Sequence, residues 1–128
     1  MIDVQAMFPV MVADDLEALK HFYEVTFGFT AVFYDPEFYL HLVSESGIQL
    51  GFLVPSHATQ PEFLHPQMGK DGYVISLEVA NAQTAYEWAM ENNLALAMPL
   101  KEEVWGQIHF MVEDPAGFRI DVVEHVSQ

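Results

Sequence analysis

The stretch that decides the fold lies near the end of the chain and reads Trp105-Gly-Gln-Ile-His-Phe-Met-Val-Glu-Asp-Pro-Ala-Gly-Phe-Arg-Ile-Asp-Val-Val-Glu124. Two apolar runs flank Asp114-Pro-Ala-Gly117, which has the chemistry of a tight turn. Proline presets φ near about −65°, aspartate hydrogen-bonds the backbone ahead of it, and glycine tolerates positive φ. The stretch therefore predicts two antiparallel strands. The second carries one acid, Asp121, which faces either a ligand or the solvent at a sheet edge.

Length and composition bound the class of protein. A chain of 128 residues with 52% apolar side chains predicts one packed globular domain over residues 1–128. No apolar run approaches the roughly 20 residues of a membrane helix, and the N-terminus lacks the basic region of a signal peptide. The sequence has no cysteine, which excludes disulfides and thiol catalysis. We expect a cytoplasmic protein that does not bind membranes.

The charge balance is strongly acidic. Four basic residues stand against nineteen acids, for a net charge of −15. Such a surface repels phosphate backbones, so nucleic acid is excluded as a partner. It attracts a cationic ligand or a basic partner, although solubility is the commoner reason for an acidic surface.

Strand and helix signals occur twice in the same order. Module one, residues 1–54, has a strand at 6–13, a helix capped by Asp14 or Asp15 and ended by Gly28, and strands at 29–34, 39–43 and 48–54. Module two, residues 73–128, has a strand at 73–80, a helix capped by Asn81, a strand at 94–99, a charged turn at 101–103 and the closing pair. Residues 55–72 are rich in proline and glycine and predict a connecting loop.

The two modules also share a short sequence similarity just before the predicted helix of each. Met11-Val-Ala-Asp14 is echoed by Glu78-Val-Ala-Asn81, 67 positions later. One module of this size cannot cover both faces of its sheet, so we expect the two to pair. The predicted fold class is α+β, with two βαβββ modules.

Several stretches together resemble the glyoxalase/bleomycin-resistance/dioxygenase superfamily, also called vicinal oxygen chelate proteins. They are Pro9-Val-Met-Val, Asp15-Leu-Glu-Ala, Phe22-Tyr-Glu-Val-Thr-Phe-Gly-Phe29 and Trp105-Gly-Gln through Glu124. The resemblance implies that the modules pair into a cup-shaped mixed sheet around a cavity, with the helices on the outer face. It also implies a homodimer.

The resemblance further implies where a metal would bind. Enzymatic members hold a divalent ion with His, Gln or Glu on the first and last strands of each module. Here the four positions fall on Phe8 (or Met7, if the internal repeat sets the alignment), Gln49, Val74 and Asp121. Hard divalent ions need several oxygen or nitrogen ligands, and two of these positions offer hydrocarbon. We therefore expect no metal centre and no cofactor.

Two histidines lie on predicted strands. His41 falls on the strand at 39–43, and alternation places His109 on one face with Trp105 and Gln107. Either ring could face the cavity, although a strand histidine is more often a satisfied core or edge residue. The histidines lack the i, i+4 spacing of a helical metal site.

These observations favour a non-catalytic protein that binds a small aromatic or cationic organic ligand by stacking and charge attraction. Trp105 would supply a flat surface and Asp121 a lone acid. The predicted ligand-binding residues are Phe8, Gln49, Ser76, Trp105, His109 and Asp121. One alternative is a metal-dependent lyase, isomerase or dioxygenase that uses Gln49 and Asp121 with His109 or His41. Another is a scaffold whose partner surface is marked by Trp88.

Overall fold

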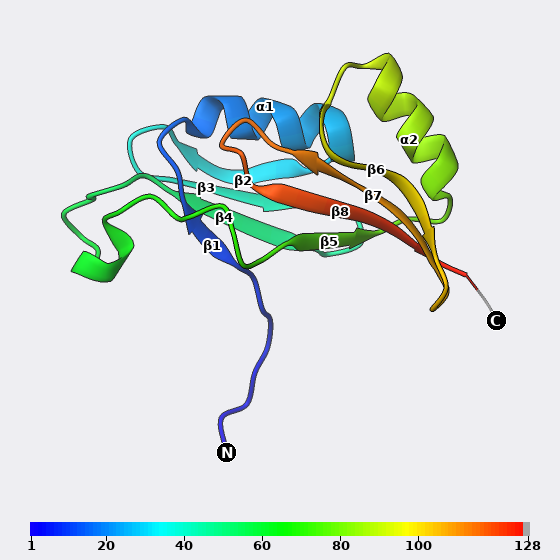
Figure 1. Cartoon of the computed structure of the whole chain (residues 1–128). Helices are drawn as coiled ribbons and strands as arrows, with labels where there is room; N and C mark the ends of the chain where they lie inside the picture. The colour runs from blue at the N-terminus through cyan, green and yellow to red at the C-terminus, as the bar shows by residue number, and fades with distance from the viewer. Residues whose placement is uncertain (127–128) are drawn as a thin grey trace. The chain divides into compact units, whose positions relative to one another are not determined.

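The computed structural model describes residues 1–126 and divides into two compact units, Met1–Gly69 and Lys70 onward (Figure 1). Each unit contains one four-stranded sheet and one long helix, so the fold class is α+β with two βαβββ modules. Within residues 1–126, no helix has both the length and the apolar character needed to cross a membrane.

The first unit follows the predicted order. Its elements are β1 (Val10–Val12), α1 (Leu16–Phe27), β2 (Thr30–Asp35), β3 (Tyr39–Val43), β4 (Gln49–Leu53) and a short 3₁₀ helix, η1 (Glu62–Leu64). The sheet order is β1-β4-β3-β2, with β1 parallel to β4 and the other pairs antiparallel. Asp15 caps α1 by accepting from the Ala18 amide, and Gly28 ends it at φ 70°.

Helix α1 buries one face of this sheet. The ring of Tyr23 on α1 lies 5.5 Å from that of Phe52 on β4, and both side chains are fully buried. Strand side chains alternate between faces, so Leu40, Leu42 and Leu50 share the α1 face. Tyr39, His41 and Gln49 consequently lie on the opposite face.

The second unit repeats this architecture. Its elements are β5 (Ile75–Glu78), α2 (Ala82–Glu91), β6 (Ala95–Glu103), β7 (Gln107–Glu113) and β8 (Arg119–His125). The sheet order is β5-β8-β7-β6, and β5 is parallel to β8. Asn81 caps α2 as predicted, and the carboxylate of Glu124 accepts from the Ala82 amide.

The turn at Asp114–Gly117 forms as predicted. The Gly117 amide donates to the Asp114 carbonyl at 2.8 Å, and Gly117 has φ 84°. The Asp114 carboxylate accepts from the amides of Ala116 and Phe118. This turn fixes the register of β7 on β8, with Glu113 opposite Arg119.

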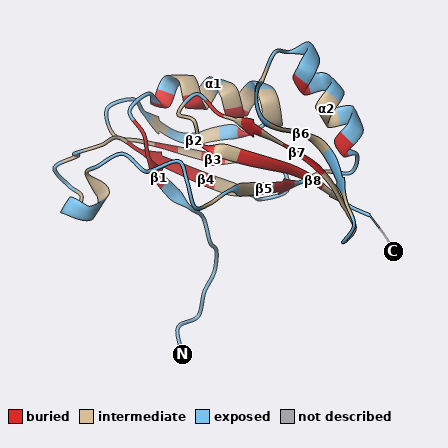
Figure 2. Cartoon of the chain, viewed as in Figure 1, coloured by how far each residue is buried: buried red, intermediate tan, exposed pale blue. Residues whose placement is uncertain are grey.

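Helix α2 covers the face of the second sheet that carries Phe110, whose ring lies 5.3 Å from that of Tyr86. Val112, Ile120 and Val122 are buried on the same face, and Figure 2 colours the middle of β8 as buried. His109 and Asp121 therefore lie on the face away from α2.

Several local predictions differ from the structure. Lys101-Glu-Glu103 is not a turn, because β6 continues through these residues and the turn comes at Val104–Gly106. Two register shifts between Leu96 and Lys101 let the strand continue past Pro99. The first strand is also shorter than predicted. As helix caps, Asp15 and Asn81 are equivalent, whereas the sequence match paired Asn81 with Asp14. The two modules therefore align one position away from that match.

Candidate functional site

In the first unit, a histidine is held between a phenol and an amide. His41 Nε2 lies 2.7 Å from Oε1 of Gln49, and its Nδ1 lies 2.7 Å from the hydroxyl of Tyr39. An amide oxygen only accepts, so Nε2 carries the proton and the Tyr39 hydroxyl donates to Nδ1. The ring of Phe8 meets the imidazole edge-on at 4.7 Å. Both nitrogens of the His41 imidazole thus have a hydrogen-bond partner.

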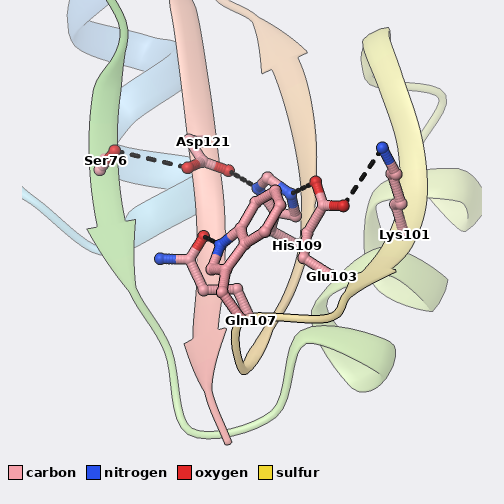
Figure 3. A network of polar contacts seen from close by, with 7 residues as sticks. Ser76, Lys101, Glu103, Gln107, His109 and Asp121 are labelled. Atoms are coloured by element: carbon pink, nitrogen blue, oxygen red, sulfur yellow. Dashed lines mark hydrogen bonds and ion pairs between the residues drawn. The ribbon is translucent and has the colours of Figure 1, made fainter.

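In the second unit, the corresponding histidine is held between two carboxylates (Figure 3). His109 Nδ1 lies 2.7 Å from Oδ1 of Asp121, and its Nε2 lies 3.0 Å from Oε2 of Glu103. Glu103 Oε1 also pairs with Lys101 Nζ at 3.2 Å. On the other side, the Ser76 hydroxyl donates to Oδ2 of Asp121 over 3.4 Å.

The two histidines occupy equivalent places in their modules. His41 is on β3 and His109 on β7, the central antiparallel strand of each sheet. Gln49 precedes the residue opposite His41 by two positions, and Asp121 precedes the residue opposite His109 by two positions. In each unit, therefore, the last strand supplies an oxygen that the preceding strand's imidazole binds.

The two carboxylate partners of His109 favour its protonated form. An ionised carboxylate can only accept, so two carboxylates on one ring require an N–H at both nitrogens. Burial by itself lowers the pKa of His109, but the hydrogen bonds to Glu103 and Asp121, and their charges, outweigh it and raise that pKa. The hydrogen bond from His109 in turn lowers the pKa of Glu103, against the opposing effect of desolvation. Lys101, Glu103, His109 and Asp121 form a chain of alternating charge.

Asp121 is consequently not the lone acid that the sequence suggested. It is 7% exposed, its partner His109 is 6% exposed, and the two form a buried ion pair. Ser76 on β5 lies directly opposite Asp121 on β8. Sequence reasoning missed Glu103, because it was assigned to a turn. Alternation along a longer β6 would have placed it on the His109 side of the sheet.

The other predicted site residues divide between the units. Phe8 and Gln49 meet at His41 in the first unit. Trp105 lies at the β6–β7 turn, 61% exposed, and its indole N–H donates to Gln107 Oε1 at 3.0 Å. The side chain of Trp105 is thus exposed, whereas that of His109 is buried. Tyr39 was not predicted, although its place two residues before His41 put both side chains on one face.

The ion pair around His109 predicts a pH dependence of stability. A group whose pKa is raised on folding stabilises the fold fully below its unfolded value, about 6.5, and loses that contribution as the pH rises through the folded value. We expect the melting temperature to fall as the pH rises from about 6.5 into the alkaline range. Thermal denaturation across this range measures the effect.

The matched controls for this prediction are the two equivalent histidines. His109→Gln should remove the alkaline fall in melting temperature, whereas His41→Gln should retain it because His41 has no carboxylate partner. An equal fall in the His109→Gln variant would assign the effect to another group. On the acid side, Glu103 contributes stability that is lost as the pH falls through its lowered pKa.

Fold and site together define a protein of two βαβββ modules, each with an imidazole bound to the oxygen of its last strand. A family model, described as the glyoxalase/bleomycin resistance protein/dioxygenase superfamily, matches residues 6–122. The chain belongs to this superfamily. No curated protein matches the sequence at a significant level.

Solved structures resemble the chain in fold. A glyoxalase/bleomycin resistance protein/dioxygenase from Nocardioides has a TM-score of 0.78 at 17% identity, covering 99% of this chain and 87% of its own. A superfamily member from Sphaerobacter thermophilus has a TM-score of 0.74 at 24% identity, covering 98% and 100%. A lactoylglutathione lyase from Agrobacterium tumefaciens has a TM-score of 0.74 at 20% identity, covering 95% and 94%. At these identities the likeness concerns the fold alone.

The metal that the superfamily implies does not fit the residues of this chain. Phe8 and Val74 have no ligand atoms, and the oxygen of Gln49 already accepts from a histidine. Asp121 is tied to His109. Within residues 1–126, no group of three or more His, Asp or Glu side chains is arranged to hold a metal ion.

The acids around His109 do not form a substitute site. Glu103 and Asp121 bind opposite nitrogens of one imidazole ring, so their carboxylates point at each other across that ring. An ion at either nitrogen would contact only one of the two carboxylates, whereas a stable site needs convergent ligands.

Proposed function

We propose that this protein is a non-catalytic binder of a small aromatic or cationic organic ligand. The observation that carries the proposal is how the side-chain oxygens of Gln49 and Asp121, on the last strand of each unit, are hydrogen-bonded. Both are bound to histidines, and the second oxygen of Asp121 accepts a long hydrogen bond of 3.4 Å from the exposed Ser76 hydroxyl. That oxygen can accept a hydrogen bond from an ammonium, amidinium or amide group.

The charge and the aromatic residues support the same ligand class. A net charge of −15 attracts cations over the whole surface. Trp105 exposes most of its ring and provides a face for stacking or for a cation–π contact. Phe8, Gln49, Ser76, Trp105, His109 and Asp121 remain the proposed ligand-binding residues, with Glu103 added as the residue that fixes His109.

Calorimetric titration tests the proposal. With bleomycin or benzamidine as the cationic probe, we expect binding whose affinity falls as salt is raised, because added ions screen the attraction. Asp121→Asn should weaken the binding of benzamidine, and the exposed pair member Glu78→Gln serves as a control for general charge removal. Absence of heat with either probe and with neutral aromatic compounds would refute this ligand class.

We further propose a homodimer in the cytoplasm, as the superfamily resemblance and the acidic, cysteine-free composition suggest. Sedimentation equilibrium measures the assembly directly. A mass that stays at 14.5 kDa over the accessible concentration range would contradict the dimer.

The alternative function is a metal-dependent lyase, isomerase or dioxygenase. It is favoured by one observation, that Gln49 and Asp121 are oxygen-bearing side chains at two superfamily ligand positions. Elemental analysis after growth with added nickel, manganese, iron and zinc decides between the two. Stoichiometric metal that is lost together with a turnover activity on chelation would favour the enzyme.

A further inference from the structure

The connecting segment of the first unit builds a structure of its own. The amide of Ser56 donates to the carbonyl of His65 at 3.0 Å, which joins the two ends of the loop. Inside it, His65 Nε2 donates to the Gln60 carbonyl at 2.8 Å, and η1 provides two further backbone hydrogen bonds. A surface loop whose ends are joined in this way is frequently functional.

The loop also contains a strained residue. Ser56 has φ 58°, a conformation that residues other than glycine rarely adopt. Such a conformation persists where surrounding contacts hold it, and here the hydrogen bond to His65 does so. The backbone is therefore fixed in the shape that positions the side chains of Gln60 and Leu64.

These two side chains line one side of an open pocket on the first sheet. The cavity has a volume of about 320 Å³, and its walls are entirely uncharged. This volume is at the small end of the roughly 300–1,000 Å³ found for ligand pockets, so it suits one or two fused rings. The lining residues are Val10, Phe38, Tyr39, Leu53, Gln60 and Leu64.

The aromatic walls of the cavity are held in place. The hydroxyl of Tyr39 is fixed by His41, and its ring lies over Gly51, where no side chain intervenes. The ring of Phe38 packs against the tilted imidazole of His57, with ring centroids 4.5 Å apart, and lies 6.1 Å from the ring of Tyr39. A ligand that enters thus meets preformed ring surfaces and pays little to order them.

We propose that this open pocket beside the loop binds an uncharged aromatic group of one or two fused rings, with the Gln60 amide as the polar contact. This inference rests on the proposed function, because it assumes that the protein binds small aromatic compounds. Gln60 is the one lining residue with a polar group besides Tyr39, whose hydroxyl already donates to His41. The Gln60 amide nitrogen already donates to the Thr59 hydroxyl over 3.3 Å. Its oxygen can still accept from a hydroxyl, and its second N–H can donate to a ring nitrogen.

The experiment uses 2-naphthol, a neutral bicyclic probe, followed by methyl NMR and calorimetry on the whole chain. We expect 2-naphthol to shift the methyl signals of Val10, Leu53 and Leu64. Leu64→Trp fills the cavity and should lower the affinity for 2-naphthol by about tenfold or more. Phe63→Trp is the matched control, since Phe63 is the neighbouring residue of η1, is 79% exposed and lies outside the cavity.

Benzamidine separates this inference from the proposed function. Its binding should be the same in the wild type and in Leu64→Trp. If 2-naphthol binds equally well to both, or shifts other methyl groups, the pocket assignment is wrong while the proposed function stands. If neither probe binds the wild type, both are wrong. Should Leu64→Trp not fold, Gln60→Ala and the wild-type methyl shifts give the same decision, because loss of the amide should weaken binding several-fold.

Discussion

Replacing His109 with alanine is expected to destabilise the folded chain by about 3 kcal/mol, the usual cost of leaving a buried charge without its partner. The side chain is 6% exposed and lies between the carboxylates of Asp121 and Glu103, at 2.7 and 3.0 Å. Without the imidazolium, two acids face each other across an empty space. For a chain of this length the loss corresponds to a fall in melting temperature of roughly 10 °C.

The control for this prediction is His125, which also pairs with a carboxylate. His125 Nε2 lies 2.8 Å from Glu78, but both side chains are at least half exposed. His125→Ala should therefore change stability little, since exposed ion pairs contribute little. A double-mutant cycle with Asp121→Asn should show that His109→Ala costs less once the acid is neutral. Equal costs in both backgrounds would contradict the ion-pair account.

Gly51→Ala is expected to have the second largest effect, a loss of about 1–3 kcal/mol from overpacking. A Cβ at position 51 would overlap the Tyr39 hydroxyl and lie 2.9 Å from its ring carbon Cζ. The ring would have to move, and its hydrogen bond to His41 would break. Thermal denaturation measures the loss, and the His41 ring resonances report the broken hydrogen bond.

Gly69→Ala is the matched control, because a Cβ there would meet nothing within 4 Å. In a Tyr39→Ala background, Gly51→Ala should cost little, since the overlapping ring is gone. A cost that persists in that background would place the strain elsewhere in the sheet.

Much of the fold follows from local signals in the sequence. Asp15 and Asn81 sit directly before amphipathic runs, and both cap their helices. The Asp114–Gly117 turn was recognisable because proline, aspartate and glycine each satisfy one requirement of a tight turn. These features depend on residues within a few positions of one another, so the sequence alone is enough to place them.

The site depended on contacts between strands, which local patterns do not show. Alternation identified His109 and Asp121 as candidates but not as partners, since their pairing follows from the register of β7 on β8. Glu103 was missed because a charged run after a proline is typical of a turn. The strand continues there because β-bulges shift the register of β6 on β7, which lets the two strands stay paired on both sides of the proline.

The equivalent placement of His41 and His109 means that the protein contains its own comparison of two histidine environments. Both rings occupy the same site in a repeated architecture, and each binds the oxygen of the next strand. They differ in their neighbours, a phenol and an amide in one module and two carboxylates in the other. One repeated framework can therefore surround an imidazole either with uncharged partners or with carboxylates, according to which side chains lie beside the ring.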